Sequence, residues 1–340
     1  MNRVGYIDVA RGISIILVVA FHSNLKVIFP GFLDAMGLFR MPLFFFLSGV
    51  FFNFRSGAKK FVVLRIDALL KPYFITLFLV LTYSVIFQGD EFFGQFLGIL
   101  YGNGDTIKWS PMWFLTHLFV VHLFCYFVLK YFEFQNWSVL AKFTVVFIMF
   151  AVGCYFLSCF WNKEINIFNN VYFLVGLPFS IDLVLISSSF FLMGNFLRKQ
   201  VVNFQINNFY LLISVFIFLV VCLFTDSKVD LNKRIYSYPL FSLLASVSGI
   251  YFVLCFSKIV SGFNVVGRIL SYIGESSLFI LIFHMYIGIV SYKVLVEYLE
   301  SDVLISIVAF IISIGFSLVI KEVVSNNRVL SALYLPLKRK

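Results

Sequence analysis

Apolar residues along this chain gather into ten long stretches, separated by short polar or charged segments. A membrane-spanning α-helix needs about 20 mostly apolar residues to cross the hydrocarbon core of a bilayer. Each stretch is close to that length, so the pattern predicts an all-α, polytopic integral membrane protein with about ten transmembrane helices. The predicted helices cover residues 6–29, 36–54, 68–87, 111–132, 139–161, 171–197, 209–225, 238–256, 272–292 and 303–320.

Proline and glycine refine this pattern. Pro72 falls in the first turn of the helix 68–87, where proline is tolerated, and Pro178 predicts a kink within the helix 171–197. The segment 88–110 is polar and holds the turn signal Gly-Asn-Gly-Asp. Because no linker, repeat or low-complexity run interrupts the chain, residues 1–340 are expected to form a single transmembrane domain without an appended soluble domain.

Composition agrees with a membrane protein and indicates its orientation. Of 340 residues, 12% are charged, against about 25% in a typical soluble domain. If the N-terminus is cytoplasmic, 18 of the 26 Lys and Arg residues, including Arg3, Lys338, Arg339 and Lys340, lie in cytoplasmic segments and 8 in outer ones. Positive charge concentrates on the cytoplasmic side of membrane proteins. We therefore expect both termini to be cytoplasmic, and this bias explains the net charge of +10 without a nucleic-acid role.

Cysteine and histidine patterns give no sign of a disulfide framework or a metal site. The five cysteines lie within apolar stretches without a Cys-x-x-Cys motif, and we interpret them as buried free thiols. His117 and His122 lie five residues apart, so on a helix they diverge by about 140°. The zinc motif His-Glu-x-x-His is absent. No metal is expected.

The first predicted helix carries three ionisable residues, Asp8, Arg11 and His22. Such residues are costly inside a bilayer, so each is a functional candidate. Arg11 and His22 are 11 residues apart, which places both on one helix face about 16 Å apart along the axis, and Asp8 lies within about 40° of the same line. The alternative is that Asp8 pairs with Arg11 at the interface and that His22 is a satisfied core histidine.

Five motifs occur in order along almost the whole chain. They are Arg-x₁₀-His at 11–22, Met-Pro-Leu-Phe-Phe-Phe-Leu-Ser-Gly at 41–49, a basic run before Pro-Tyr at 65–73, Trp-Phe-Leu at 113–115, and a Ser-Leu…His segment at 273–284. Together they resemble the motifs of membrane-bound acyltransferase family 3, polytopic O-acyltransferases of bacterial surface glycans. The chain is most similar to the short, fucose-4-O-acetylase-like branch. Position 40 is often His in that branch and is Arg40 here, and Ala68 stands where a second arginine is common.

The resemblance implies an acetyl-coenzyme A-dependent O-acetyltransferase of the bacterial inner membrane, acting on a sugar hydroxyl of an O-antigen, capsule or exopolysaccharide. Acyl-coenzyme A carries phosphates that need cations at the cytoplasmic face. The candidate donor-binding residues are Arg55, Lys59, Lys60, Arg65 and Lys71. The alternative is that they are only the ordinary positive charge of inner loops.

Candidate acceptor contacts are Arg40, Ser48, Trp113, Asp182, Glu275 and His284. The alternative for Trp113 is a place in an outer aromatic belt. The alternative for Asp182 is to form hydrogen bonds with backbone groups that Pro178 leaves unpaired. Glu275 and His284 are nine residues apart, about half a turn out of phase, so they are not expected to line one narrow groove.

The expected chemistry centres on His22. A sugar hydroxyl is a weak nucleophile until a base takes its proton, and histidine is the commonest such base near neutral pH. Asp8 is then expected to orient or balance charge, and Arg11 to stabilise negative charge on the acyl transition state or to hold the donor. The transferred acyl group could also be longer than acetyl. The alternative function is a transporter or flippase of lipid-linked glycans, although the paired interrupted helices of inverted repeats are not evident.

Overall fold

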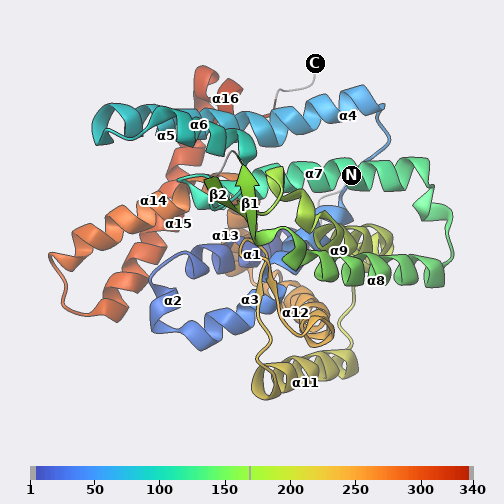
Figure 1. Ribbon diagram of the computed structural model, residues 1–340. Helices are drawn as coiled ribbons and strands as arrows, with labels where there is room; N and C mark the ends of the chain where they lie inside the picture. The colour runs from blue at the N-terminus through green and yellow to red at the C-terminus, as the bar shows by residue number, and fades with distance from the viewer. Residues whose placement is uncertain (1–4, 168–169, 337–340) are drawn as a thin grey trace. The chain divides into compact units, whose positions relative to one another are not determined.

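The computed structural model describes residues 5–167 and 170–336 (Figure 1). Four basic residues counted above, Arg3, Lys338, Arg339 and Lys340, lie outside these ranges. Eight helices of the described part are long and apolar enough to cross a membrane, which confirms the all-α polytopic class. The other two predicted spans, 6–29 and 209–225, correspond to helices of 17 residues each.

The chain divides into two compact units, each built from segments that are distant in sequence. The first unit comprises residues 1–50, 197–231 and 235–323, and the second comprises 51–196, 232–234 and 324–340. The first unit contains α1 (Gly5–Phe21), α2 (Leu25–Ile28), α3 (Pro30–Val50), α10 (Arg198–Val202), α11 (Asn208–Phe224), α12 (Pro239–Val260), α13 (Asn264–Glu275), α14 (Ser277–Val296), most of α15 (Asp302–Asn326), and the antiparallel strands β3 (Val229–Asp230) and β4 (Ile235–Tyr236).

Close packing between α1 and α13 fixes the course of the first helix. A Cβ atom on Gly12 of α1 would overlap the carbonyl of Leu270, and a Cβ atom on Gly274 of α13 would overlap the carbonyl of Asp8. Only glycine permits this approach at either position. Because α1 ends at Phe21, the crossing also determines where His22 is held.

Polar contacts hold α3 against its neighbours in the same unit. The hydroxyl of Ser246 on α12 donates to the carbonyl of Leu38 at 2.6 Å. The hydroxyl of Tyr236, at the end of β4, lies 3.1 Å from the same Ser246 oxygen. These bonds anchor α3 two residues before Arg40.

The second unit holds the remaining elements. They are α4 (Ala58–Arg65), a π-helical turn (Ile66–Leu70), α5 (Lys71–Gln88), α6 (Phe92–Tyr101), α7 (Trp113–Tyr131), α8 (Val139–Phe156), α9 (Val184–Phe196), α16 (Arg328–Tyr334), the 3₁₀ turns Ser110–Met112, Phe134–Asn136, Leu157–Cys159 and Pro178–Leu183, and the antiparallel strands β1 (Trp161–Ile167) and β2 (Asn170–Val175).

The predicted helix 171–197 is wrong in its first part, because residues 170–175 form strand β2, which pairs antiparallel with β1 (residues 161–167). The helical run begins only at Pro178, as a 3₁₀ turn that leads into α9. Phe179 and Ser180 have positive φ values of 54° and 53°, a conformation that a continuous α-helix excludes. Asp182 therefore lies in the turn before α9 and not in the middle of a helix.

Other predicted boundaries also differ from the structure. The helix predicted at 68–87 begins at Ala58, because α4, the π-helical turn and α5 run on without a break. The wider π-helical turn ends at Leu70, two residues before Pro72. In a regular α-helix the Pro72 ring would clash with the carbonyl four residues earlier. The polar segment 88–110 contains α6. The predicted helix 6–29 is broken after Phe21, where Ser23 donates to the Ala20 carbonyl at 2.8 Å and α1 ends.

Candidate active site

His22 is presented at the end of α1 with an exposed side chain. It lies just beyond the last residue of the helix, and its amide still donates to the carbonyls of Val18 and Val19, both at 3.2 Å. The helical phase expected from Arg11 therefore continues almost to this residue. The His22 ring lies edge-on to Phe21, with ring centroids 5.5 Å apart.

His284, on α14, is the second histidine of this cluster. Its ring centroid lies 5.6 Å from that of His22, although the two residues are far apart in sequence. The side chain is 2% exposed, and Nδ1–H donates to the carbonyl of Ile280 at 2.7 Å. Within the described residues, Nε2 is buried without a hydrogen-bond partner. Such an unsatisfied group costs about 1–3 kcal/mol, so its presence needs an explanation.

Arg40, on α3, supplies positive charge beside this pair. Its side chain is 5% exposed, and its guanidinium stacks on the ring of Phe21 at 3.7 Å. Arg40 and His284 both act electrostatically on His22. Asp34 and Asp230 attract Arg40, but in the described part of the chain no carboxylate forms an ion pair with it. The structure thus brings together three of the sequence-predicted residues: His22, His284 and Arg40.

The other candidates of the first unit lie apart from this cluster. Arg11 Nη1 is 3.4 Å from Asp8 Oδ1, about 16 Å along α1 from His22, which agrees with the pairing alternative. Ser48 is eight residues beyond Arg40 on α3. The predicted helix 272–292 is broken at Ser276, between α13 and α14, so Glu275 is the last residue of α13, and its side chain is exposed.

The predicted donor-binding cations all belong to the second unit and differ in how strongly they are engaged. Arg55, Lys59 and Lys60 are exposed. Arg65 stacks on Phe61 at 5.0 Å. Lys71 binds Asp67 at 2.6 Å and donates to the Leu335 carbonyl at 2.7 Å.

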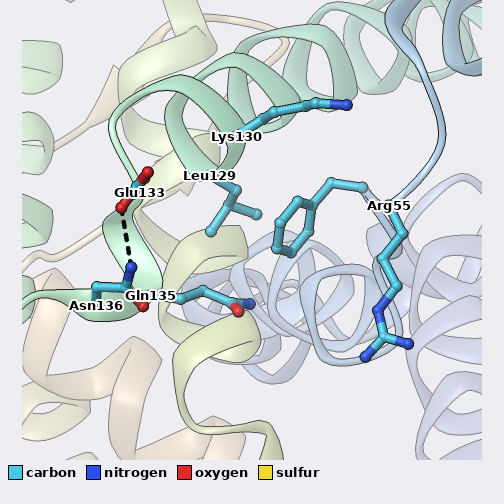
Figure 2. A pocket seen from close by; sticks show the side chains of 7 residues that line it. Arg55, Leu129, Lys130, Glu133, Gln135 and Asn136 are labelled. Carbon is cyan, nitrogen blue, oxygen red and sulfur yellow. Dashed lines mark hydrogen bonds between the residues drawn. The ribbon is translucent and has the colours of Figure 1, made fainter.

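A pocket of about 270 Å³ adjoins Arg55 (Figure 2). In this view the Lys130 side chain runs to the right and the Arg55 side chain runs downward, so their charged ends lie apart. Lys130 donates to the Ser56 carbonyl at 3.0 Å, and Asn136 donates to Glu133 at 3.0 Å. The pocket is lined by Phe54, Arg55, Leu129, Lys130, Glu133, Gln135 and Asn136.

Asp182 is the acceptor in a buried network that sequence reasoning missed. Arg234 Nε donates to Asp182 Oδ2 at 2.9 Å, and Nη2 donates to Oδ1 and to Ser180 Oγ, each at 3.2 Å. The guanidinium also stacks on Trp161 at 4.8 Å. Asp182 Oδ1 accepts the Leu177 amide at 2.9 Å as well. No sequence signal distinguished Arg234 from the ordinary basic residues of an outer loop.

Trp113 and the two histidines of α7 are packed inside the second unit. Trp113 is 6% exposed and stacks on His117 at 5.6 Å, so it is not on the surface of its unit. His117 Nε2 lies 2.7 Å from Ser187 Oγ, whereas His122 stacks on Phe52 at 5.3 Å. The two histidines therefore have separate environments, as their spacing predicted. All five cysteines are free, but only Cys125 and Cys255 are buried as expected, whereas Cys154 and Cys222 are half-buried and Cys159 is exposed.

Comparison with known proteins gives one match. The family model of an acyltransferase domain, that of acyltransferase family 3, matches residues 4–322. No curated protein and no solved structure matches the chain. The family match covers nearly the whole sequence and agrees with the motifs that run along it.

Proposed function

Since the chain belongs to membrane-bound acyltransferase family 3, we propose that it transfers an acetyl group from acetyl-coenzyme A to a sugar hydroxyl. The acceptor is a bacterial cell-surface polysaccharide (O-antigen, capsule or exopolysaccharide) or its precursor, and the site of reaction is the bacterial inner membrane with both termini cytoplasmic. The observation that carries the proposal is an exposed histidine, His22, beside a buried arginine that has no carboxylate partner among the described residues.

The reaction needs a base and a group that stabilises negative charge. His22 takes the proton of the attacking hydroxyl, and the alkoxide oxygen forms a bond to the thioester carbonyl carbon. The carbonyl oxygen becomes negatively charged at that stage, and Arg40 is the cation best placed to stabilise it. The carbon–sulfur bond then breaks, and the sulfur of coenzyme A leaves with the proton that His22 held.

The donor's phosphates require a cationic surface. Arg55, Lys59 and Lys60 support this role because their side chains are exposed. Arg65 and Lys71 are engaged with aromatic or acidic neighbours, so they contribute less to it. Within this proposal Asp8 and Arg11 keep α1 in place as a pair, and they do not contact the reacting atoms.

The test is mass spectrometry of surface glycans from a bacterial host with and without the gene. Addition of one acetyl unit that depends on the gene supports the proposal, whereas a longer added chain would correct the acyl group. The variant His22→Gln keeps a polar side chain but cannot take a proton at neutral pH. We expect it to lower acyl transfer by about 10²–10⁴-fold in membranes normalised for protein.

A matched control is Asn24→Gln, two residues further along the same turn. It changes side-chain size without touching the cluster, so acyl transfer should stay within about twofold, because surface changes of this kind alter stability little. Activity near wild type for His22→Gln would remove His22 as the base. Unchanged glycans together with movement of lipid-linked glycan across the membrane would favour a flippase.

A further inference from the structure

We infer that His284 is a positioning residue for His22, to which it offers Nε2 as a hydrogen-bond acceptor. His22 then donates from the nitrogen that faces His284 and keeps its other nitrogen free to take the acceptor's proton. The inference rests on the proposed function, because it assigns a partner to the base of that reaction.

The tautomer of His284 follows from its backbone contacts. Nδ1 lies 2.7 Å from the Ile280 carbonyl and 3.1 Å from the Leu281 carbonyl. A carbonyl oxygen only accepts, so Nδ1 carries the hydrogen, and Nε2 of the neutral ring is left as an acceptor. That acceptor is buried without a partner in the described residues, on a side chain that is 2% exposed.

The ring of His22 is the neighbour that can satisfy this acceptor. The two centroids are 5.6 Å apart and the planes are tilted by 55°, so a modest rotation of the exposed His22 side chain brings facing nitrogens to hydrogen-bond distance. The backbone of His22 is fixed by the hydrogen bonds of its amide at the end of α1, so only its side chain needs to rotate. His284 is fixed by its carbonyl contacts, so it is the rigid member of the pair.

A neutral partner suits a base that must release its proton again. When His22 is protonated, the hydrogen bond to Nε2 disperses its positive charge. The protonated histidine pair then carries a charge of +1, whereas a histidine paired with a carboxylate would carry no net charge. Arg40 is a second positive charge near this pair. The proton therefore passes readily from His22 to the departing sulfur, which ends the cycle with both rings neutral.

The experiment compares two replacements of His284 in full-length protein, with radiolabelled acetyl-coenzyme A as the probe and the glycan fraction of the membranes as the acceptor. His284→Phe keeps a ring in this buried place but has no acceptor. We expect kcat to fall at least about 100-fold, with the KM for acetyl-coenzyme A and the thermal midpoint unchanged. His284→Gln offers a side-chain carbonyl near the position of Nε2 and should stay within about tenfold of wild type.

A purely structural role predicts the opposite pattern. The phenyl ring would then be as active as wild type, or it would lose activity only in step with thermal stability, and either result overturns the inference. If His284→Phe does not insert, His284→Asn replaces it, because its amide can still donate to the Ile280 carbonyl and it is too short to reach His22.

A double variant separates this inference from the proposed function. If His284 acts through His22, adding His284→Phe to His22→Gln should lower kcat by less than twofold further, because residues that act as one unit are not additive. A full additional 100-fold loss would give His284 an independent role. Full activity of the single variant His22→Gln would instead contradict the proposed function itself.

Discussion

Two buried arginines, Arg40 in the first unit and Arg234 in the second, have opposite surroundings. Arg234 donates to both carboxylate oxygens of Asp182 and to Ser180, and the residue is 7% exposed. Arg40 is 5% exposed and stacks on Phe21 without an ion pair in the described part. A buried charge is expensive unless it is paired. The charge of Arg234 is balanced by Asp182 within the fold. The N–H groups of Arg40 stay available for a ligand or a transition state.

The same difference extends to the neighbours of each arginine. Around Arg234, Asn103 accepts both the amide and the hydroxyl of Ser180 at 2.9 Å. One close neighbour of this arginine, Asn232, keeps a buried side-chain oxygen without a partner among the described residues. Near Arg40, His284 keeps a buried nitrogen without a partner in the part of the chain that the structure describes. Satisfied networks give rigidity, whereas strained or unsatisfied groups concentrate at functional sites. Stability and activity should therefore respond to substitutions in the two regions in opposite ways.

The largest effect on stability is expected from Arg234→Met. It leaves Asp182 buried without its partner, which typically costs about 3–5 kcal/mol, so the thermal midpoint in detergent should fall steeply. Adding Asp182→Asn should restore part of the loss, because the amide oxygen can still accept the Leu177 N–H without a buried charge. Lys233→Met, which breaks the more exposed pair with Asp105, is the control and should cost at most about 1 kcal/mol. Equal losses for Arg234→Met and Lys233→Met would contradict the contrast.

Arg40→Met should show the reverse behaviour. Methionine fills the space on Phe21, so the thermal midpoint should change little. Acyl transfer should fall by about 10²–10³-fold, the usual effect of removing one donor to a developing oxyanion, chiefly in kcat. Arg40→Lys keeps the charge without the planar guanidinium and should be intermediate. An Arg40→Met protein that is active, or one that unfolds like Arg234→Met, would end the distinction between the two arginines.

The sequence predicted the helices and some candidate residues of the molecule, but not the contacts between distant segments. Hydropathy located the spans because each is long and apolar, and the phase of α1 nominated His22, whose role stays a prediction. The pattern could not show that His284 and Arg40 would meet His22, because their distance is set by the packing of α1, α3 and α14. It also missed the β1–β2 hairpin. Residues 171–175 are apolar and adjoin an apolar helix, so hydropathy alone does not separate strand from helix there.

Asp182 and Arg234 show why the rest was out of reach. They are 52 residues apart, and each has an ordinary local role in the sequence, one beside a proline and one in a basic loop. Only the folded second unit joins them. The candidate donor-binding cations present the opposite difficulty. Exposed positive charge is expected in any segment predicted to be cytoplasmic, whether or not a ligand binds there.

The smallest predicted effect concerns the exposed cations, and it distinguishes donor binding from ordinary inner-loop charge. The triple variant Arg55→Gln, Lys59→Gln and Lys60→Gln should raise the KM for acetyl-coenzyme A by about tenfold at low salt, because an exposed ion pair is worth at most about 1 kcal/mol. The difference from wild type should shrink as salt is added, since screening weakens interactions between exposed charges. Arg65 is kept in this design, because its guanidinium packs on Phe61 and its replacement would disturb the fold.

The control is a triple variant of exposed lysines outside the proposed donor surface, Lys163→Gln, Lys228→Gln and Lys233→Gln. It removes the same formal charge, so it measures how far net charge alone alters donor binding. We expect its KM for acetyl-coenzyme A to stay within about twofold of wild type, because exposed charges that do not contact the donor act on it only through an interaction that salt screens. If the two triple variants shift KM equally, Arg55, Lys59 and Lys60 serve only as ordinary inner-loop charge. The donor's phosphates must then bind elsewhere on the second unit or on the first.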